Sequence, residues 1–371
     1  MIRIPDNVLK FSDNEDLFKA WGDYFNHYRA VNFGINKDYD KNRSLDEKAE
    51  KLNRAIQAEI NKFAGTPSET VISERIWQTS PQYRWAAFAV VNALVDMVIP
   101  DVVADAYGRF SEIRNIGYGD SAVFDIKSSD LFYVTKNGNN RRHVTAQRQF
   151  TGQTSLIPQN NSITVQLDVY RILCGKENLA EYAMKVALSI ESEIAKDVYV
   201  ALSNSYNNPT ANFNEAAFTQ NAFLKLRNRV SAANGGSRVY VYGTDIALSG
   251  ILPQSDYLKM GLGETYNSIG YLPVYMNTSL IAFPQKIDWT SRDYEFALAN
   301  DELFFIASNS QSLVKIVFEG ETISIADSQY ANANLTQDVT MHKKWVVGIV
   351  TNSKYGIMKL PDNTYNANHS Q

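Results

Sequence analysis

The sequence predicts an α+β protein organised around a polar β-hairpin that leads into one long helix. Between Lys176 and Pro209 there is neither glycine nor proline, so nothing in the backbone forces a helix to break. Apolar residues recur there at steps of three and four, which predicts a helix over residues 177–203 with one apolar stripe. At ~1.5 Å per residue this helix is roughly 40 Å long. The stripe consists of Leu179, Ala183, Val186, Ala187, Ile190, Ile194 and Val198.

The segment before this helix has the pattern of a long β-hairpin. Residues 163–170 alternate between apolar and polar side chains, as residues 124–127 do, and residues 131–134 are expected to continue the earlier strand. Asn137 and Gly138 form the strongest short turn signal in the chain. The surrounding residues are polar, and a two-stranded ribbon alone in water is marginally stable. We therefore expect a hairpin that projects outward and is completed by another copy of the chain.

Composition places the chain among folded proteins without a strong attraction to nucleic acid. Of its 371 residues 44% are hydrophobic and 20% charged, and the formal net charge is −4. The single cysteine, Cys174, excludes a disulfide within the chain and is expected to be a small buried residue. The N-terminus lacks the apolar core of a signal peptide. The most apolar run, residues 85–99, is interrupted by polar residues and is too short to cross a membrane, so no membrane is expected as a partner.

Three helices are predicted before the hairpin, over residues 12–30, 44–63 and 84–107. The second begins with a capping box formed by Ser44 and Glu47. Its apolar face is narrow on a heavily charged helix, so we expect it to dock on a neighbouring subunit or along the inner surface of an assembly of copies. The third is expected to kink or split at Pro100. The narrow face consists of Leu52, Ile56, Ile60 and Phe63.

After Pro209 the pattern becomes an alternation of helices and strands, which indicates a compact α/β part. Gly261 and Gly263 are expected to lie in a mobile loop, and residues 296–308 to form a pair of strands. From residue 313 onward strands predominate. The other predicted elements are helices over 215–232 and 245–252, and strands over 239–242, 271–276, 314–318, 339–351 and 355–360.

No arrangement of residues points to catalysis, a metal or a cofactor. The four histidines are scattered, and no phosphate-binding loop or nucleophile elbow occurs. Ser312 and Lys315 match S-x-x-K, but they lie in a predicted strand. Asp38 begins a calcium-loop-like run whose required glycine is replaced by Arg43. Basic residues on the predicted hairpin could contact phosphate, but in an acidic chain we expect them to be rim charges at a subunit contact.

The order of these elements resembles the major capsid proteins of tailed bacteriophages with the Hong Kong 97-like fold. Residues 124–170 resemble that family's extended loop (E-loop) and residues 177–203 its spine helix. Residues 257–274 resemble the A-domain loop and the G-x-P-V-like strand that follows it. Residues 344–359 resemble the closing strands of the P domain; Lys343 or Lys344 and Tyr355 stand where the family often carries an arginine and Y-x-P.

The resemblance implies a division of the chain into six parts. These are an N-terminal helical arm (1–80), the first part of the P domain (81–117), the E-loop β-hairpin (118–172), the spine helix of the P domain (173–208), the A domain (209–308), and the closing P-domain strands with a C-terminal tail (309–371). Some family members remove an N-terminal segment, whereas we expect this one to stay as an ordered arm. Some also cross-link a lysine to an asparagine, but no spacing singles out such a pair here.

The function implied is a structural head protein that assembles as pentamers and hexamers into an icosahedral shell around a double-stranded DNA genome. Implied partners are further copies, non-specifically contacted DNA, and possible scaffold, portal and decoration proteins; the implied location is the virion, after assembly in the host cytoplasm. Alternatives are an encapsulin-like compartment or an enzyme without a recognisable motif. One chain that fills pentameric and hexameric positions needs hinges, for which Gly117, Gly119, Gly152 and Gly175 are candidates. The candidate E-loop interface residues are Lys127, Lys136, Arg141, Arg142 and Arg148.

Overall fold

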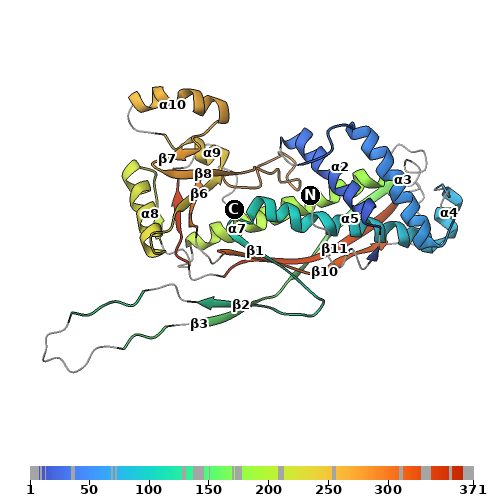
Figure 1. The fold of residues 1–371 in the computed structure, drawn as a ribbon, viewed down its shortest axis with the longest axis horizontal. Coiled ribbons are helices and arrows are strands. Elements are labelled where there is room, and N and C mark those ends of the chain that lie inside the picture. The colour runs from blue at the N-terminus through green and yellow to red at the C-terminus, as the bar shows by residue number, and fades with distance from the viewer. Residues whose placement is uncertain are drawn as a thin grey trace.

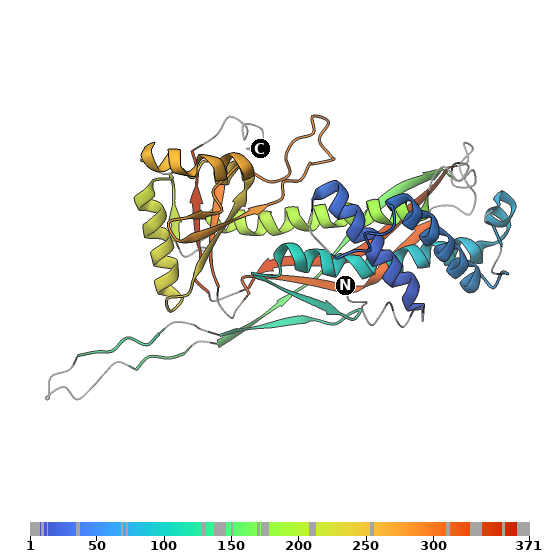
Figure 2. The same cartoon turned by 45° about the horizontal axis from the view of Figure 1, so that its top comes forward.

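The protein consists of a helical lobe at one end, a smaller α/β lobe at the other, and an arm that projects from between them (Figures 1 and 2). A four-stranded sheet runs below two long helices in the middle of the molecule and connects the lobes (Figure 1). The computed structural model describes residues 8, 11–12, 14–34, 38–67, 70–71, 73–127, 131–136, 146–149, 151–168, 171, 178–207, 213–252, 256–308, 312–326, 336–350 and 353–361.

The predicted long helix is confirmed as α7, Leu179–Asn207, with 29 residues. All seven residues of its predicted stripe are buried, against α5 and the four-stranded sheet. The boundary differs from the expected one at both ends, because helix ends are set by local capping and packing rather than by the stripe. The helix therefore has its stabilising partners within its own chain.

Helix α5, Pro81–Tyr107, has 27 residues and continues through Pro100. The expectation was a kink or a split at this proline, and the helix is not split there. The estimate that the apolar run is too short to cross a membrane is wrong. By length and composition α5 is the one described helix that passes as a membrane span, but 78% of its apolar window is buried inside the protein. Since α2, α3, α7 and the sheet surround it, α5 is the central core helix.

Helices α2, Glu15–Phe33, and α3, Leu45–Ala64, cover the outside of α5 (Figure 2). The predicted cap at Ser44 is confirmed: the backbone N–H of Glu47 donates to Ser44 Oγ at 3.2 Å. The expectation that the apolar face of α3 docks on a neighbouring subunit is wrong for its main residues. Leu52, Ile56 and Ile60 are buried within the chain, since α3 packs on α2 and α5.

The four-stranded sheet has the order β1-β10-β11-β4. Strand β1 is parallel to β10, the other neighbours are antiparallel, and a bulge interrupts β10 between Glu319 and Ile323. Residues 163–168, expected to belong to the projecting hairpin, instead pair with β11 inside this sheet, with Val165 opposite Val339. Alternation reveals which face of a strand is apolar but not which strand it pairs with. The strands are β1 Ser111–Ile116, β4 Gln159–Asp168, β10 Val314–Ala326 and β11 Thr336–Ile349.

The α/β lobe is built on a six-stranded sheet of order β5-β12-β9-β6-β8-β7. Gly261 and Gly263 lie inside α10 rather than in a loop, and residues 296–308 supply only one strand of this sheet. The last strand, β12, pairs with β9 and β5, so the late strands are shared between the two sheets. The elements are β5 Phe213–Glu215, α8 Gln220–Ala233, β6 Val239–Thr244, α9 Asp245–Ser249, α10 Asp256–Ile269, β7 Val274–Tyr275, β8 Thr278–Phe283, β9 Glu302–Ala307 and β12 Gly356–Lys359. A short helix, α4, Glu74–Thr79, precedes α5 in the other lobe.

Candidate assembly interface

The arm, residues 117–158 between β1 and β4, begins with a two-stranded ladder of β2, Ala122–Lys127, and β3, Thr151–Leu156. The ladder is not free in solvent. Phe124, on β2, is only 1% exposed and packs with Ala122, Val317 and Val350 in a small core of its own. The Arg114 guanidinium lies 4.2 Å from the centroid of the Phe124 ring. The root of the arm is thus held on the outer face of the four-stranded sheet of the same chain.

Beyond the ladder the arm leaves the body of the protein (Figure 1). The described residues 131–136 and 146–149 contain no strand, so the expectation that residues 131–134 continue one is wrong. Among the described residues of this outer part, the Gln147 side chain joins the two sides: it accepts from the Tyr133 N–H at 2.9 Å and donates to the Tyr133 carbonyl at 2.7 Å. The predicted turn at Asn137 and Gly138 lies outside the described residues.

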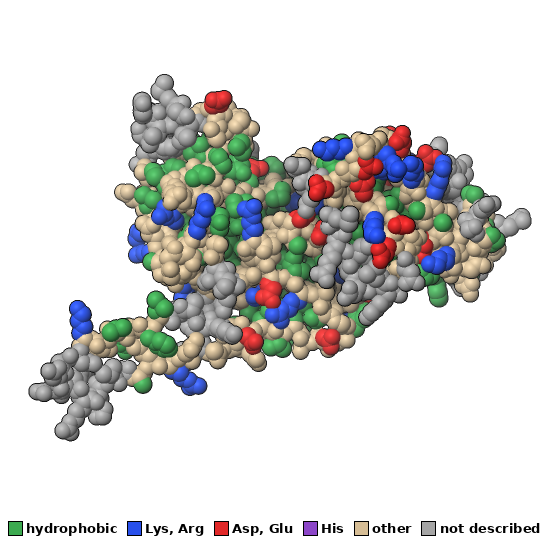
Figure 3. Space-filling view, viewed as in Figure 1, with side chains coloured by type: hydrophobic (Ala, Val, Ile, Leu, Met, Phe, Trp, Pro, Cys, Tyr) green, Lys and Arg blue, Asp and Glu red, His purple; other side chains and the backbone are tan. Residues whose placement is uncertain are grey.

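Four consecutive large apolar residues are bare on this outer part of the arm. Leu131 is 89% exposed, Phe132 58%, Tyr133 60% and Val134 93%. Hydrophobic side chains are visible along the arm in Figure 3. An exposed apolar run of this kind typically marks a contact with another protein. The sequence pattern predicted a strand over these residues in an otherwise polar hairpin. The four consecutive apolar residues were the sequence signal for this exposed segment.

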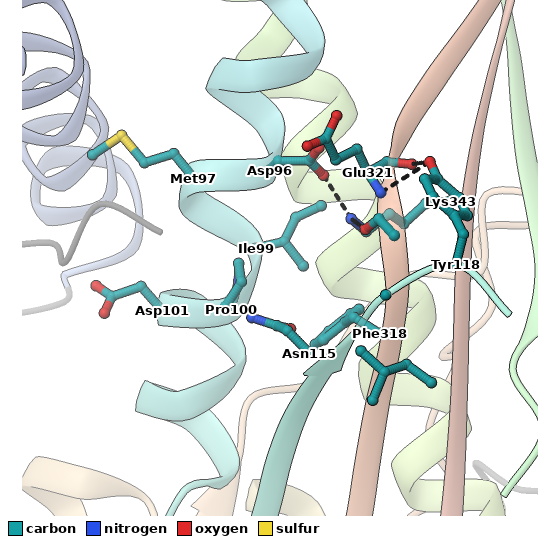
Figure 4. A pocket seen from close by; sticks show the side chains of 13 residues that line it. Asp96, Met97, Ile99, Pro100, Asp101, Asn115, Tyr118, Phe318, Glu321 and Lys343 are labelled. Carbon is teal, nitrogen blue, oxygen red and sulfur yellow. Dashed lines mark hydrogen bonds and ion pairs between the residues drawn. The ribbon is translucent and has the colours of Figure 1, made fainter. Parts of the chain in front are cut away.

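The turn between β1 and β2 is tied to the bulge in β10 (Figure 4). Tyr118 Oη donates to the Glu321 carbonyl at 2.8 Å and accepts from the Glu321 N–H at 3.0 Å. The Gly119 N–H donates to Glu319 Oε1 at 3.1 Å, and this bond holds the pKa of the Glu319 carboxyl below its usual value. Gly119 has φ +78°, a conformation that favours glycine. These bonds fix where the arm starts relative to the sheet.

Directly behind this turn lies a buried ion pair. Lys343 Nζ is 2.7 Å from Asp96 Oδ1, and the two side chains are 8% and 5% exposed (Figure 4). Asp96 also accepts from the N–H and the hydroxyl of Thr322, while Lys343 donates to the carbonyl of Gly320. The pair thus satisfies the polar groups that the bulge leaves without strand partners. A cavity of about 560 Å³ lies between it, α5 and Tyr118.

The predicted interface and hinge residues are spread along the arm. Gly117 and Gly119 lie in the tied turn, where the Gly117 N–H donates to Asp120 at 3.2 Å. Gly152 stands opposite Ile126 in the ladder. Lys127 ends β2, opposite Thr151. Lys136 and Arg148 are exposed on the outer arm, whereas Arg141, Arg142 and Gly175 lie outside the described residues.

Two features that the sequence raised, a metal site and the S-x-x-K match, can be compared with the described residues. Among them no group of three or more His, Cys, Asp or Glu side chains is placed to hold a metal ion. Lys315, of the S-x-x-K match, forms an ion pair with Glu112 and lies over the Phe124 ring. It is a structural side chain in β10 rather than a base beside a nucleophile. What the arrangement can do is make contacts between protein surfaces.

Three comparisons with known proteins bear on this geometry. Residues 28–359 match the family described as "SPbeta prophage-derived putative capsid protein YonB". No curated protein sequence matches the chain. Among solved structures, the capsid of the cyanophage P-SCSP1u aligns with 10% identity and a TM-score of 0.47, over 68% of this chain and 87% of that one. The acid-stable capsid of the Helicobacter pylori bacteriophage KHP30 aligns with 10% identity and a TM-score of 0.46, over 68% and 90%.

A virus-like particle from Pyrococcus furiosus aligns with 10% identity and a TM-score of 0.41, over 70% of this chain and 95% of that one. The fold has the elements that the Hong Kong 97-like resemblance implied, in the same order: N-terminal helices, projecting arm, long helix, α/β lobe and closing strands. The protein is a phage capsid protein by class. More narrowly, the match over residues 28–359 shows that the chain belongs to the YonB family.

Proposed function

We propose that this chain is the major head protein of a tailed phage, and that its copies associate as pentamers and hexamers into an icosahedral shell around double-stranded DNA. The observation that carries the proposal is the arm, whose root is packed on its own sheet while Leu131 and Val134 are 89% and 93% exposed. The exposed apolar residues of this arm suit a contact with a second copy of the chain, which would remove them from water.

The energetics favour a contact between subunits at this segment. Burial of one large apolar side chain contributes about 1.5–3 kcal/mol, and residues 131–134 supply four of them. In the described residues of the outer arm, 131–136 and 146–149, no ladder offsets the ordering cost of about 1–2 kcal/mol per residue. A neighbouring subunit provides the missing apolar surface. Repeated over a closed shell, many contacts of moderate strength add through multivalency.

The charges and glycines of the arm have supporting roles in this proposal. Lys127, Lys136, Arg141, Arg142 and Arg148 would surround the apolar contact as polar rim charges. The glycines at 117, 119, 152 and 175 would let the arm adopt different angles in pentamers and hexamers. Gly119 has φ +78°, which favours glycine, and a change of angle at this turn would require its bonds to Glu319 and Glu321 to rearrange.

The wider setting follows from the same proposal. The shell would enclose DNA without binding it tightly, because the net charge of −4 gives little attraction to phosphate. Scaffold, portal and decoration proteins would be further partners, and no membrane, cofactor or catalytic step would be required. The protein would be assembled in the host cytoplasm and reside in the virion.

Electron microscopy and sedimentation of the expressed protein test this function. We expect hollow particles of uniform size; small oligomers alone would refute the proposal. In particles isolated from the native source, nuclease-resistant double-stranded DNA supports a genome shell. Particles that enclose protein cargo without DNA would favour the encapsulin-like alternative.

A further inference from the structure

A second exposed element lies far along the chain from the arm. The connection between β8 and β9, residues 284–301, forms a hairpin that we call the aromatic hairpin. Its two sides are joined by a bridge between Ile287 and Phe296 and by the Asp288 N–H, which donates to the Glu295 carbonyl at 2.8 Å. In Figure 2 it is the orange segment that projects beside α7. It belongs to neither large sheet.

Two aromatic rings form the tip of the aromatic hairpin. Trp289 is 74% exposed and Tyr294 67%. Their ring centroids are 6.1 Å apart at an interplanar angle of 86°, which is an edge-to-face contact. Among the ring pairs of the described residues, this is the one in which both rings are more than half exposed. Tyr294 has φ +52°, an uncommon conformation for a residue other than glycine.

Two ion pairs connect the aromatic hairpin to α7. Asp288 accepts from the N–H and hydroxyl of Thr290 at 2.9 and 2.6 Å and lies 3.7 Å from Lys196 on α7. Lys286 forms a second ion pair to α7, 3.2 Å from Glu191. These contacts order the backbone beside Trp289 before any partner arrives, which reduces the ordering cost of binding. Tryptophan and tyrosine on a preorganised surface are the residues that most often dominate protein interfaces.

The chemistry around the rings favours a protein partner over a phosphate-bearing one. The aromatic hairpin carries two basic residues and four acidic residues, so nucleic acid and anionic lipid are not attracted to it. Beside Trp289 lies a groove of about 620 Å³ whose lining includes Ile190, Met341 and Trp345. Polar residues, Glu193, Lys196 and His342 among them, complete the lining, so the groove is mixed in character and Trp289 is a large exposed ring at its edge. An aromatic ring with polar groups around it is the usual composition of a protein contact.

We propose that the aromatic hairpin is a docking point for a second copy of this chain, and that Trp289 and Tyr294 become buried in that contact. The inference rests on the proposed function, because membership of a capsid family is what makes another copy the abundant partner. It adds a contact surface on the α7 side of the molecule, separate from the arm. Contacts at two separate places allow each subunit to join more than one neighbour.

Tryptophan fluorescence provides a direct test, because only two of the five tryptophans are exposed. Trp21, Trp77 and Trp345 are at most 3% exposed, while Trp85 is 72% and Trp289 74% exposed. In a Trp85→Phe variant, acrylamide quenching therefore reports Trp289. We expect the quenching constant to fall roughly threefold when subunits assemble into particles, since a ring at an interface core is removed from solvent. The matched Trp289→Phe variant reports Trp85 and is the control for general effects of assembly.

Assembly itself gives the second measurement. The double variant Trp289→Ala, Tyr294→Ala should raise the subunit concentration needed for particles roughly tenfold or more, while Trp85→Ala leaves it nearly unchanged. Thermal unfolding of the subunits checks that both variants are folded. Particles in which Trp289 stays accessible would overturn the inference and leave the proposed function intact. Failure of the unaltered chain to form particles would overturn both, and burial of Trp289 only after addition of a different protein would overturn the choice of partner.

Discussion

Helix α7 and the arm are separated in the chain by β4, and they differ in how much of their apolar surface is buried within the subunit. Helix α7 buries one side along its whole length, with Ile194 at 0% exposure, against partners in its own chain. The outer arm exposes Leu131 and Val134 almost fully, and in its described residues the bridge between the two sides is made by Gln147. The helix therefore has its packing partners in its own subunit, whereas in the proposed function the outer arm gains its order on a neighbouring subunit.

The division falls inside the arm rather than at its start. Phe124 is 1% exposed on β2, and Val134 is 93% exposed only ten residues later. The root has a hydrophobic partner, Val317, on the sheet beneath it, and the outer part has none among the described residues. The root of the arm is therefore stabilised by packing on the four-stranded sheet of its own subunit. Four predictions test this contrast, ranked by their effect on the unfolding free energy of the subunit.

The largest effect is expected at the buried ion pair. Asp96→Ala leaves Lys343 charged and buried, which should lower the unfolding free energy by about 3–5 kcal/mol in denaturant titrations. The matched double variant Asp96→Leu, Lys343→Met removes both charges and should recover most of this loss. A double variant no more stable than Asp96→Ala would show that the bonds to Thr322 and Gly320 matter more than the charge.

Helix α7 should respond next most strongly. Ile194→Ala removes a fully buried side chain, and the resulting cavity should cost about 2–5 kcal/mol. The control is Val200→Ala on the same helix, where the side chain is 42% exposed and the loss should be much smaller. Equal losses at the two positions in thermal unfolding would contradict the buried stripe.

The bond between Gly119 and Glu319 predicts a small pH effect confined to the arm root. Because this bond lowers the pKa of Glu319 from 4.5, its contribution is present above pH 4.5 and is lost as the pH falls further, through the lowered pKa. Hydrogen exchange of the Gly119 amide should accelerate in that acidic range beyond the intrinsic rate. Glu319→Gln removes the titration, so a variant with the same acid response would rule out this carboxyl as the cause.

The smallest effect on the subunit is expected from the outer arm, although assembly should be abolished. The triple variant Leu131→Ser, Phe132→Ser, Val134→Ser should change the unfolding free energy by no more than about 0.5 kcal/mol. Particles should be absent by electron microscopy. Val31→Ser, at a position 62% exposed on α2, is the matched control and should assemble normally. A triple variant that unfolds would place this segment in the core, and one that forms full shells would remove it from the interface.

Local features of the chain were readable from sequence because neighbouring residues encode them. The stripe of α7 and the cap at Ser44 depend on spacings of three or four residues, and both are confirmed. The resemblance in element order also pointed to the capsid family, to which the chain belongs. For the candidate interface, the sequence predicted the arm but not that residues 131–134 are exposed outside any strand. The same apolar residue types occur in strands and in exposed irregular segments, so their identity alone does not distinguish the two.

Pairing between distant segments was decided only by the tertiary structure. The pattern of β4 indicated a strand, but its partner β11 begins 168 residues after it ends (residue 336 against residue 168). Asp96 and Lys343 are 247 residues apart, and Tyr118 and Glu321 are 203 apart. Periodicity specifies which face of an element is apolar, whereas its partner is chosen by the packing of the whole chain. The exposure of the Trp289 and Tyr294 rings was likewise decided by tertiary structure, because the exposed fraction of a side chain depends on which distant segments pack around it.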